Sequence, residues 1–138
     1  MNETETEIVQ MTSDVVVTTP DSHVLLIERG WDPHKGSWAL PGGYVDAGET
    51  FRVAAARELA EEACLWVDAE ELREVGVFDR PDRDPRGRFV TVAYAITVPA
   101  GTTAQAGDDA VAAVWWPLAA LPPLAFDHAE IVAAATHA

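Results

Sequence analysis

The chain has 138 residues, of which 49% are hydrophobic and 23% charged, so it suits one globular domain with its own core. The formal net charge of −14 argues against nucleic acid as a partner, and the single cysteine excludes an internal disulfide and a cysteine-based zinc site. No apolar run reaches the length of a membrane span and the acidic N-terminus lacks a signal-peptide pattern, so a cytoplasmic protein is expected.

The predicted elements alternate short β-rich runs with two helices. We expect a flexible tail over residues 1–12, followed by one domain over 13–138. Strands are predicted at 14–19, 23–28, 74–79, 89–98 and 111–116. Helices are predicted at 50–63, with Thr50 as the N-cap, and at 127–136. This order favours an α/β fold in which a mixed sheet lies between helices.

The first predicted helix carries three glutamates on one face. Glu58, Glu61 and Glu62 stand at positions i, i+3 and i+4, one turn apart. Like charges this close repel each other, so a helix built for stability alone would disperse them. A divalent cation reverses this argument, because Mg²⁺ binds carboxylate oxygens together with substrate phosphates. The pattern therefore predicts a Mg²⁺ site, with Mn²⁺ as the alternative ion, that serves phosphate chemistry.

The spacing around these acids resembles the Nudix box, the signature of hydrolases that act on a nucleoside diphosphate linked to another moiety. The chain reads Gly43-x5-Glu49-x7-Arg57-Glu58-Leu59-x-Glu61-Glu62, and it departs from the signature only at Cys64. The family has glycine there, which suits a helix C-cap with positive φ. Cys64 therefore affects the end of the helix and not the metal ligands. The resemblance implies the Nudix α/β/α sandwich, with the mixed sheet between the helices.

The resemblance also implies a role for each residue of the pattern. The expected metal ligands are three side chains and one backbone carbonyl: Glu58, Glu61, Glu62 and Gly42. The expected catalytic residues are Glu49, Arg57, Glu61, Glu62 and, beyond the box, Asp109. In the family Glu49 pairs with Arg57, which can orient a neighbouring carboxylate, and Gly43 permits close approach of the backbone to the substrate. The implied chemistry is metal-assisted attack of water on a pyrophosphate phosphorus, without a covalent nucleophile.

Shorter segments outside the box look like those of bacterial ADP-ribose pyrophosphatase-type Nudix proteins. They lie at residues 31–38, 81–87, 107–110, 116–118 and 124–128. This likeness favours ADP-ribose as the substrate, cleaved to AMP and ribose 5-phosphate. A homodimer is likewise implied by the likeness, in which the N-terminal tail contributes a swapped strand.

Several residues outside the box have two open readings. In one interpretation, Arg83 or Arg86 binds the diphosphate or the terminal ribose phosphate of the substrate. In the other, the charges of this arginine-rich loop are balanced by its own aspartates, or the loop forms a dimer contact. Asp109 is an extra metal ligand or water-activating base, or part of a plain turn with Asp108. Trp31 stacks on adenine or packs in the core. For His128, a core or capping role is favoured over substrate contact.

Two rival functions stay open at this stage. A MutT-like enzyme would release pyrophosphate from a nucleoside triphosphate in place of forming AMP. A sensing Nudix domain would bind ADP-ribose without hydrolysing it, and regulators of that kind are expected to continue into a DNA-binding part. The intact acidic pattern favours hydrolysis over sensing.

Overall fold

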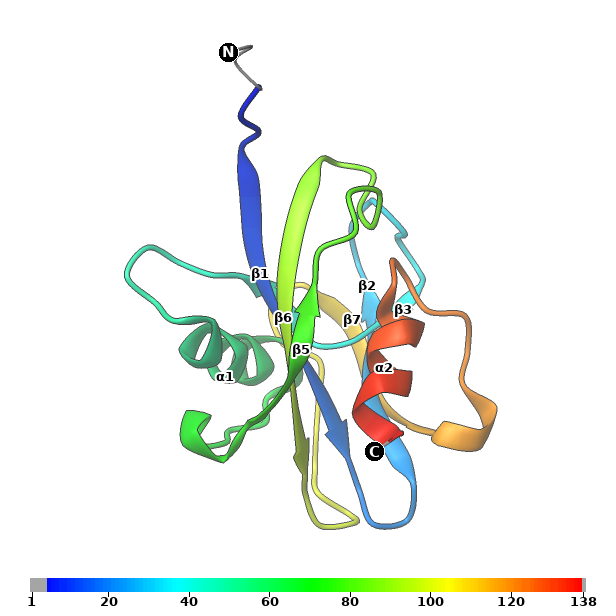
Figure 1. The fold of residues 1–138 in the computed structure, drawn as a ribbon. Helices are drawn as coiled ribbons and strands as arrows, with labels where there is room; N and C mark the ends of the chain where they lie inside the picture. The colour runs from blue at the N-terminus through cyan, green and yellow to red at the C-terminus, as the bar shows by residue number, and fades with distance from the viewer. Residues whose placement is uncertain (1–4, 138) are drawn as a thin grey trace.

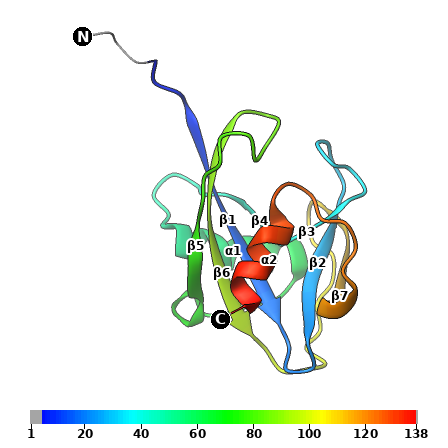
Figure 2. The ribbon, with the colours of Figure 1, turned by 45° about the vertical axis from the view of Figure 1, so that its right-hand side comes forward.

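The β-rich runs of the sequence form one mixed sheet of seven strands between two helices in the computed structural model, which describes residues 5–137 (Figure 1, Figure 2). The strands are β1 (Val9–Thr18), β2 (His23–Arg29), β3 (Trp38–Ala39), β4 (Gly42–Tyr44), β5 (Arg73–Phe78), β6 (Arg88–Thr97) and β7 (Ala110–Pro117). The helices are α1 (Phe51–Ala63) and α2 (His128–Thr136), with short 3₁₀ turns η1 (Ala69–Glu71) and η2 (Leu118–Ala120). The predicted α/β/α sandwich is confirmed.

Strand β1 separates two halves of the core. Its residues alternate between faces, as the period of two in a strand requires: Val15 and Val17 pack with the cluster under α1, and Val16 packs with the cluster under α2. All three are fully buried. A strand buried on both faces reads as a continuous apolar run, and this explains the valine run of the sequence.

The sheet opens between its first two strands, which positions the site described below. β1 pairs with β6 in parallel along its whole length, from Val9 to Thr18. With β2 it pairs only next to their turn, at Thr18 and Val24. Further along, β1 pairs instead with the short β4, while β2 pairs with β3 and β7. The strands therefore diverge, and a crevice forms between β1–β4 and β2.

The boundaries of the first strand and the first helix differ in how well local sequence predicts them. β1 begins at Val9, so residues 9–12 belong to the sheet and the predicted tail boundary at residue 12 was wrong. Long-range pairing with β6 orders this largely exposed stretch, and residues 1–4 of the predicted tail lie outside the described part of the chain. The predicted N-cap is confirmed, because the Thr50 hydroxyl accepts a hydrogen bond from the Val53 N–H.

Neither helix of the described part is long and apolar enough to cross a membrane.

Candidate functional site

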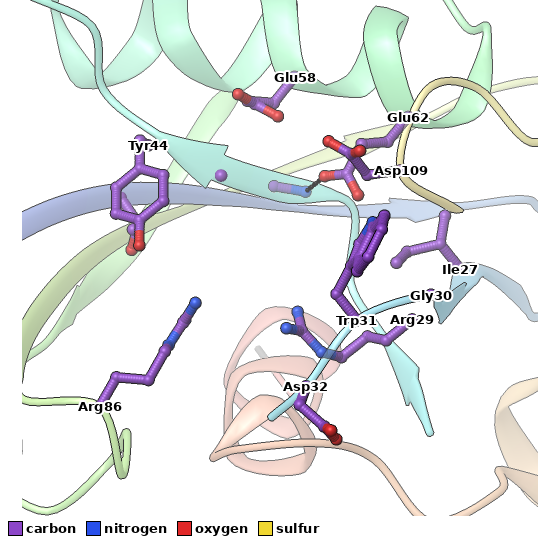
Figure 3. A pocket seen from close by; sticks show the side chains of 13 residues that line it. Ile27, Arg29, Gly30, Trp31, Asp32, Tyr44, Glu58, Glu62, Arg86 and Asp109 are labelled. Carbon is purple, nitrogen blue, oxygen red and sulfur yellow. Dashed lines mark hydrogen bonds between the residues drawn. The ribbon is translucent and has the colours of Figure 1, made fainter. Parts of the chain in front are cut away.

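A cavity of about 340 Å³ opens where β1 and β2 diverge (Figure 3). Residues from β1, β2, β4, α1 and three loops line it: Thr12, Ile27, Arg29, Gly30, Trp31, Asp32, Gly42, Gly43, Tyr44, Glu58, Glu62, Arg86 and Asp109. Figure 3 shows the acids Glu58, Glu62 and Asp109 on one side and the guanidinium groups of Arg29 and Arg86 on the other. The cavity therefore has an acidic wall and a basic wall.

Arg57 connects the acidic wall to the loop that precedes α1. Its Nε and Nη2 atoms donate to the two carboxylate oxygens of Glu49, at 2.7 and 2.8 Å. Its Nη1 donates to Glu58 at 2.8 Å and to Glu61 at 3.1 Å, and Nη2 also donates to the Tyr44 carbonyl. These bonds raise the pKa of Arg57 and lower that of Glu49. The expected pairing of Glu49 with Arg57 is present, and it fixes the orientation of Glu58.

Glu58 presents its carboxylate to the cavity beside the backbone of Gly43. A methyl group on Gly43 would lie 2.6 Å from the Glu58 carboxylate carbon, so only glycine permits this close approach. Burial raises the pKa of Glu58, while the hydrogen bond from Arg57 opposes that rise. The carboxylate is thus held close to backbone at the cavity wall, where a cation would stabilise its charged form.

Glu62 is the most perturbed acid of the site. Burial raises the pKa of its carboxyl to about 8, and the nearby charges of Glu58 and Asp14 add to the rise. The Gly42 N–H donates to Oε1 at 2.8 Å and opposes it. At neutral pH a carboxyl with this pKa holds a proton unless a positive charge replaces it. Glu62 therefore has the properties of a cation ligand whose charged form is stabilised only when the cation is bound.

Glu61, the third predicted ligand, lies apart from the other two. Its side chain is 45% exposed, accepts from Arg57 and is absent from the cavity lining. Among residues 5–137 no three His, Cys, Asp or Glu side chains converge on one point. The donors at the cavity are the hard oxygens of Glu58, Glu62 and Asp109, which suit Mg²⁺ because this ion keeps several waters and takes one or two carboxylates plus phosphates. These residues fit a cation that is coordinated partly by the protein and partly by the substrate, and they do not form a site in which the protein supplies every ligand.

The loop before β7 brings Asp109 to the acidic wall. The N–H groups of Gln105, Gly107 and Asp108 donate to the last carbonyls of α1, those of Ala63, Glu62 and Glu61. Helix α1 ends at this contact, and the next residue, Cys64, takes the left-handed conformation with φ of 52°. The expectation that Cys64 affects the helix end is consistent with this geometry, and its side chain is half-buried.

The two predicted arginines have different positions. Arg86 lines the cavity, and its Nε and Nη2 donate to the two carboxylate oxygens of Asp84, so the loop's own aspartate also balances this arginine. Arg83 is buried, and its Nε and Nη2 donate to the two carboxylate oxygens of Asp127 at 2.9 and 2.7 Å. This buried ion pair occupies the guanidinium, so the predicted contact of Arg83 with substrate phosphate is replaced by a structural role. It also explains why Asp127 does not cap α2 with its side chain.

Two further predictions concern aromatic or imidazole rings near the site. Trp31 is 68% exposed and lines the cavity, so it is placed to contact a ligand and is not a core residue. Tyr44, which sequence reasoning missed, lines the same cavity. His128 is buried and its Nδ1 accepts from the Leu40 N–H at 3.0 Å, which confirms the favoured core role.

Sequence reasoning also missed Arg29 and Asp14. Arg29 ends β2 and its guanidinium enters the cavity, but a lone arginine after an apolar strand carries no local signal. Asp14 is buried, accepts from the Thr91 hydroxyl at 2.6 Å, and lies opposite Gly42 in the sheet. Only the pairing of β1 with β4 brings it near Glu62.

Comparisons with known proteins give a consistent picture. The NUDIX domain family matches residues 9–135. The ADP-ribose pyrophosphatase of Methanocaldococcus jannaschii is 45% identical over 112 residues, which are 81% of this chain and 64% of that protein. The ADPR responsive transcriptional repressor NtrR of Acinetobacter baylyi is 38% identical over 61% of this chain and 35% of its own length. The chain thus spans less than two thirds of the length of both relatives.

Two solved structures share the fold closely. The NUDIX domain of Shewanella oneidensis NrtR complexed with ADP ribose has a TM-score of 0.85 at 30% identity, covering 94% of this chain and 88% of that one. A bifunctional NMN adenylyltransferase/ADP ribose pyrophosphatase from Francisella tularensis, complexed with AMP and a Mn ion, has a TM-score of 0.82 at 30% identity. There the match covers 94% of this chain and 41% of that one.

Proposed function

The chain belongs to the Nudix family, and on that basis we propose that it is a divalent-metal-dependent hydrolase of nucleoside diphosphates linked to another moiety. The favoured substrate is ADP-ribose, cleaved to AMP and ribose 5-phosphate. One observation carries the proposal: Glu58 and Glu62 share a cavity wall with Asp109, opposite two arginines. The similarity to an ADP-ribose pyrophosphatase and to a Nudix domain complexed with ADP ribose supports the choice of substrate.

Mg²⁺ is the proposed ion and Mn²⁺ the alternative, which the Mn ion in the Francisella structure supports. Glu58 and Glu62 would hold it, with the Gly42 carbonyl as a further ligand. When bound, a divalent cation neutralises charge on the diphosphate oxygens and makes water more acidic. Both carboxylates come from one turn of α1. Arg57 donates to Glu58 and the Gly42 N–H donates to Glu62, so the chain supplies a positioned pair of ligands.

The remaining groups of the chain would position substrate and water. Asp109, held near Glu62 by the loop contact with α1, is proposed as the base that takes a proton from the attacking water. Glu61 is proposed to complete the acidic surface through its hydrogen bond with Arg57. Trp31 would stack on the adenine ring, and Arg86 would bind substrate phosphate.

The test is an assay of the purified protein with Mg²⁺ or Mn²⁺ against ADP-ribose, dinucleotides, sugar nucleotides and oxidised deoxynucleoside triphosphates. We expect AMP and ribose 5-phosphate from ADP-ribose. Glu62→Gln should lower kcat on the order of 10²–10³-fold, since it removes a cation ligand and several kcal/mol of charge stabilisation. Glu70→Gln is the matched control, because Glu70 is exposed on η1 away from the cavity.

Product analysis separates the rival functions. Pyrophosphate released from a triphosphate would favour the MutT-like alternative over AMP formation. Tight ADP-ribose binding by calorimetry without any product would favour a sensing domain. Turnover that is equal in the wild-type protein and in Glu62→Gln would remove the enzymatic proposal.

Two predictions about the setting of the protein stay predictions. A cytoplasmic location follows from the sequence pattern alone. A homodimer follows from the resemblance, and gel filtration that gives only a monomer mass would contradict it.

A further inference from the structure

The outer side of α1 carries an apolar groove that shares no lining residue with the cavity described above. Its volume is about 670 Å³. Helix α1 forms an outer layer of the sandwich, so the groove lies at the surface and is open to molecules other than the substrate (Figure 1). The apolar lining of this outer groove comes from α1 and from the segment that follows it: Val53, Ala56, Ala60, Cys64, Trp66, Val67 and Ala69.

Trp66 leaves most of its ring in water at the edge of the outer groove. Its side chain is 76% exposed, and Val53 on the other side of the lining is 47% exposed. Within residues 5–137 the Trp66 ring stacks on no other aromatic ring and on no guanidinium. Large apolar side chains that are exposed together mark interaction surfaces, and tryptophan is enriched among the residues that dominate binding energy. The outer groove therefore has the composition of a docking site.

The shape of the outer groove favours an elongated occupant. Its α1 residues stand at i, i+3, i+7 and i+11, so they form one stripe about three turns and roughly 16 Å long. These residues are Val53, Ala56, Ala60 and Cys64. The short alanine side chains in the middle of the stripe let another backbone approach closely. A second helix laid along α1 fits such a floor, with its own apolar side chains at helical spacing in the groove.

Carboxylates lie in and beside the outer groove. Glu61 and Asp108 belong to its lining, and exposed Asp68 and Glu70 flank the lining residue Ala69. Among the described residues Asp108, Asp68 and Glu70 form no ion pair. The cations nearby are already bonded to the protein.

Those cations are two arginines of α1. Arg57 donates to Glu49, Glu58 and Glu61, and Arg52 donates to the carbonyls of Ala69 and Leu72. Their guanidinium groups therefore do not cancel the charge of the carboxylates around the outer groove, and the rim stays negative.

This negative rim decides which partner is complementary. Nucleic acids and anionic lipid surfaces carry the same sign of charge and are repelled. A second copy of this chain is also a poor match, because its formal net charge is −14. Its arginine-rich loop offers no free cation to the groove, since each of these arginines pairs with a carboxylate: Arg80, Arg83, Arg86 and Arg88. Complementarity thus points to a positively charged protein segment.

We propose that the outer groove binds a cationic amphipathic helix of a partner protein. Apolar side chains of that helix would pack against Trp66 and the alanines of the floor, and its lysines or arginines would pair with the carboxylates of the rim. The loop that supplies Asp108 continues into Asp109 of the cavity, so the partner would bind one residue away from an acid of the proposed catalytic site.

The experiment uses a synthetic peptide of leucine and lysine, about 14 residues long, whose sequence places leucine on one face of a helix. Calorimetry measures its affinity for the full chain without metal or substrate, and affinity should fall as salt is raised. The same peptide with glutamate in place of lysine should not bind. Amide chemical shifts of the labelled protein locate the peptide, and the largest changes are expected within residues 53–69 and at 107–108.

Trp66→Ala should weaken binding of the lysine peptide by about tenfold or more, because a tryptophan anchor is lost. Asp108→Asn should weaken it several-fold through the loss of one rim charge. Trp31→Ala is the matched control, since Trp31 is also an exposed tryptophan but lies at the cavity and not in the outer groove, and it should leave the affinity unchanged.

Three outcomes would overturn the proposal. The first is equal affinity for the lysine and glutamate peptides, and the second is equal affinity in the wild-type protein and Trp66→Ala. The third is a dimer that Trp66→Ala converts to monomer in sedimentation, which would assign the groove to a second copy. Thermal unfolding checks the fold of each variant, and Val53→Ser, which should bind several-fold more weakly, replaces Trp66→Ala if that variant does not fold. Peptide binding involves no hydrolysis, so its failure is distinct from a failure of the proposed function.

Discussion

The backbone N–H of Gly107 donates a hydrogen bond to the carbonyl oxygen of Glu62 over 2.8 Å. The last carbonyls of a helix have no partner within the helix, and here a distant loop supplies donors to three of them. The same loop carries Asp109, so one contact both ends α1 and sets the position of the third acid of the cavity relative to Glu62. The acidic wall depends on this contact as much as on the spacing of the glutamates.

Gly107→Ala should therefore damage both stability and activity. A methyl group at this position would lie 1.7 Å from the Glu61 carbonyl oxygen, and backbone must move to accept it. We expect a loss of about 2 kcal/mol or more in the free energy of unfolding. Activity should fall on the order of a hundredfold, because a shift of about 1 Å in a positioned group has that effect.

Urea unfolding and the kcat/KM for ADP-ribose measure these two changes. Gly76→Ala is the matched control, since a methyl group there meets only the Phe78 ring at an ordinary 3.8 Å. Wild-type stability and activity in Gly107→Ala would show that the loop does not hold the acidic wall.

Cys64→Gly should stabilise the protein. Cys64 adopts φ of 52°, a left-handed conformation that costs a residue with a side chain about 1–2 kcal/mol and costs glycine almost nothing. Glycine gains chain entropy in the unfolded state, which offsets about 0.4–1 kcal/mol of this. A net gain of about 0.5–1 kcal/mol is expected.

Cys64→Ala is the comparison for this prediction, because it removes the thiol and keeps the strained backbone. Chemical unfolding should give a larger free energy of unfolding for Cys64→Gly than for Cys64→Ala. Equal unfolding free energies would mean that this helix end bears no strain.

Local sequence was enough to predict the parts of the site that lie within one helix. The acids of α1 and the Thr50 cap follow from spacing of three or four residues, which a helix converts directly into proximity. The pairing of Glu49 with Arg57 came from the resemblance, and the structure contains it. The order of helices and strands predicted a mixed sheet between helices, and the resemblance implied the α/β/α sandwich.

The basic wall was beyond local prediction for a physical reason. Arg29 and Arg86 meet only because β2 and the loop before β6 are brought to one ring, Phe126. Arg83 and Arg86 look equivalent in the sequence, yet Asp127 buries one of them and leaves the other at the cavity. Such choices depend on partners distant along the chain, which neither periodicity nor spacing reveals.

Metal binding should release a proton from Glu62. Burial raises the pKa of this carboxyl to about 8, so below pH 8 the protein without metal holds the proton there, and a cation must displace it. Cation affinity should therefore rise by about tenfold per pH unit below pH 8 and level off above it.

Calorimetric titration of Mg²⁺ in two buffers of different ionisation enthalpy, at pH 6.5, measures the protons released. We expect about one proton per cation in the wild-type protein and none from this position in Glu62→Gln. Cation affinity that is constant between pH 6 and 8 would contradict the assignment of Glu62 as the displaced acid.

Acid pH should destabilise the fold through His128. Burial lowers the pKa of this imidazole below its usual 6.5, although Asp14 and Asp127 partly oppose the shift, while Arg83 and Arg29 add to it. In the unfolded chain the ring takes up its proton near pH 6.5, earlier than in the folded protein, as the pH falls. Stability from this group is thus complete above about pH 6.5 and is lost as the pH drops toward the folded pKa, by up to about 1.4 kcal/mol per pH unit.

His128→Asn isolates this effect, since its side-chain oxygen can replace Nδ1 as the acceptor for the Leu40 N–H but does not titrate. The variant should lose less stability than the wild-type protein when urea unfolding is compared at pH 7 and pH 5. His23→Gln, at a surface histidine beside Asp21, serves as the control and should follow the wild-type curve. The variant removes the buried imidazole that titrates. If the free energy of unfolding falls equally between pH 7 and pH 5 in His128→Asn and in the wild-type protein, another group governs acid unfolding.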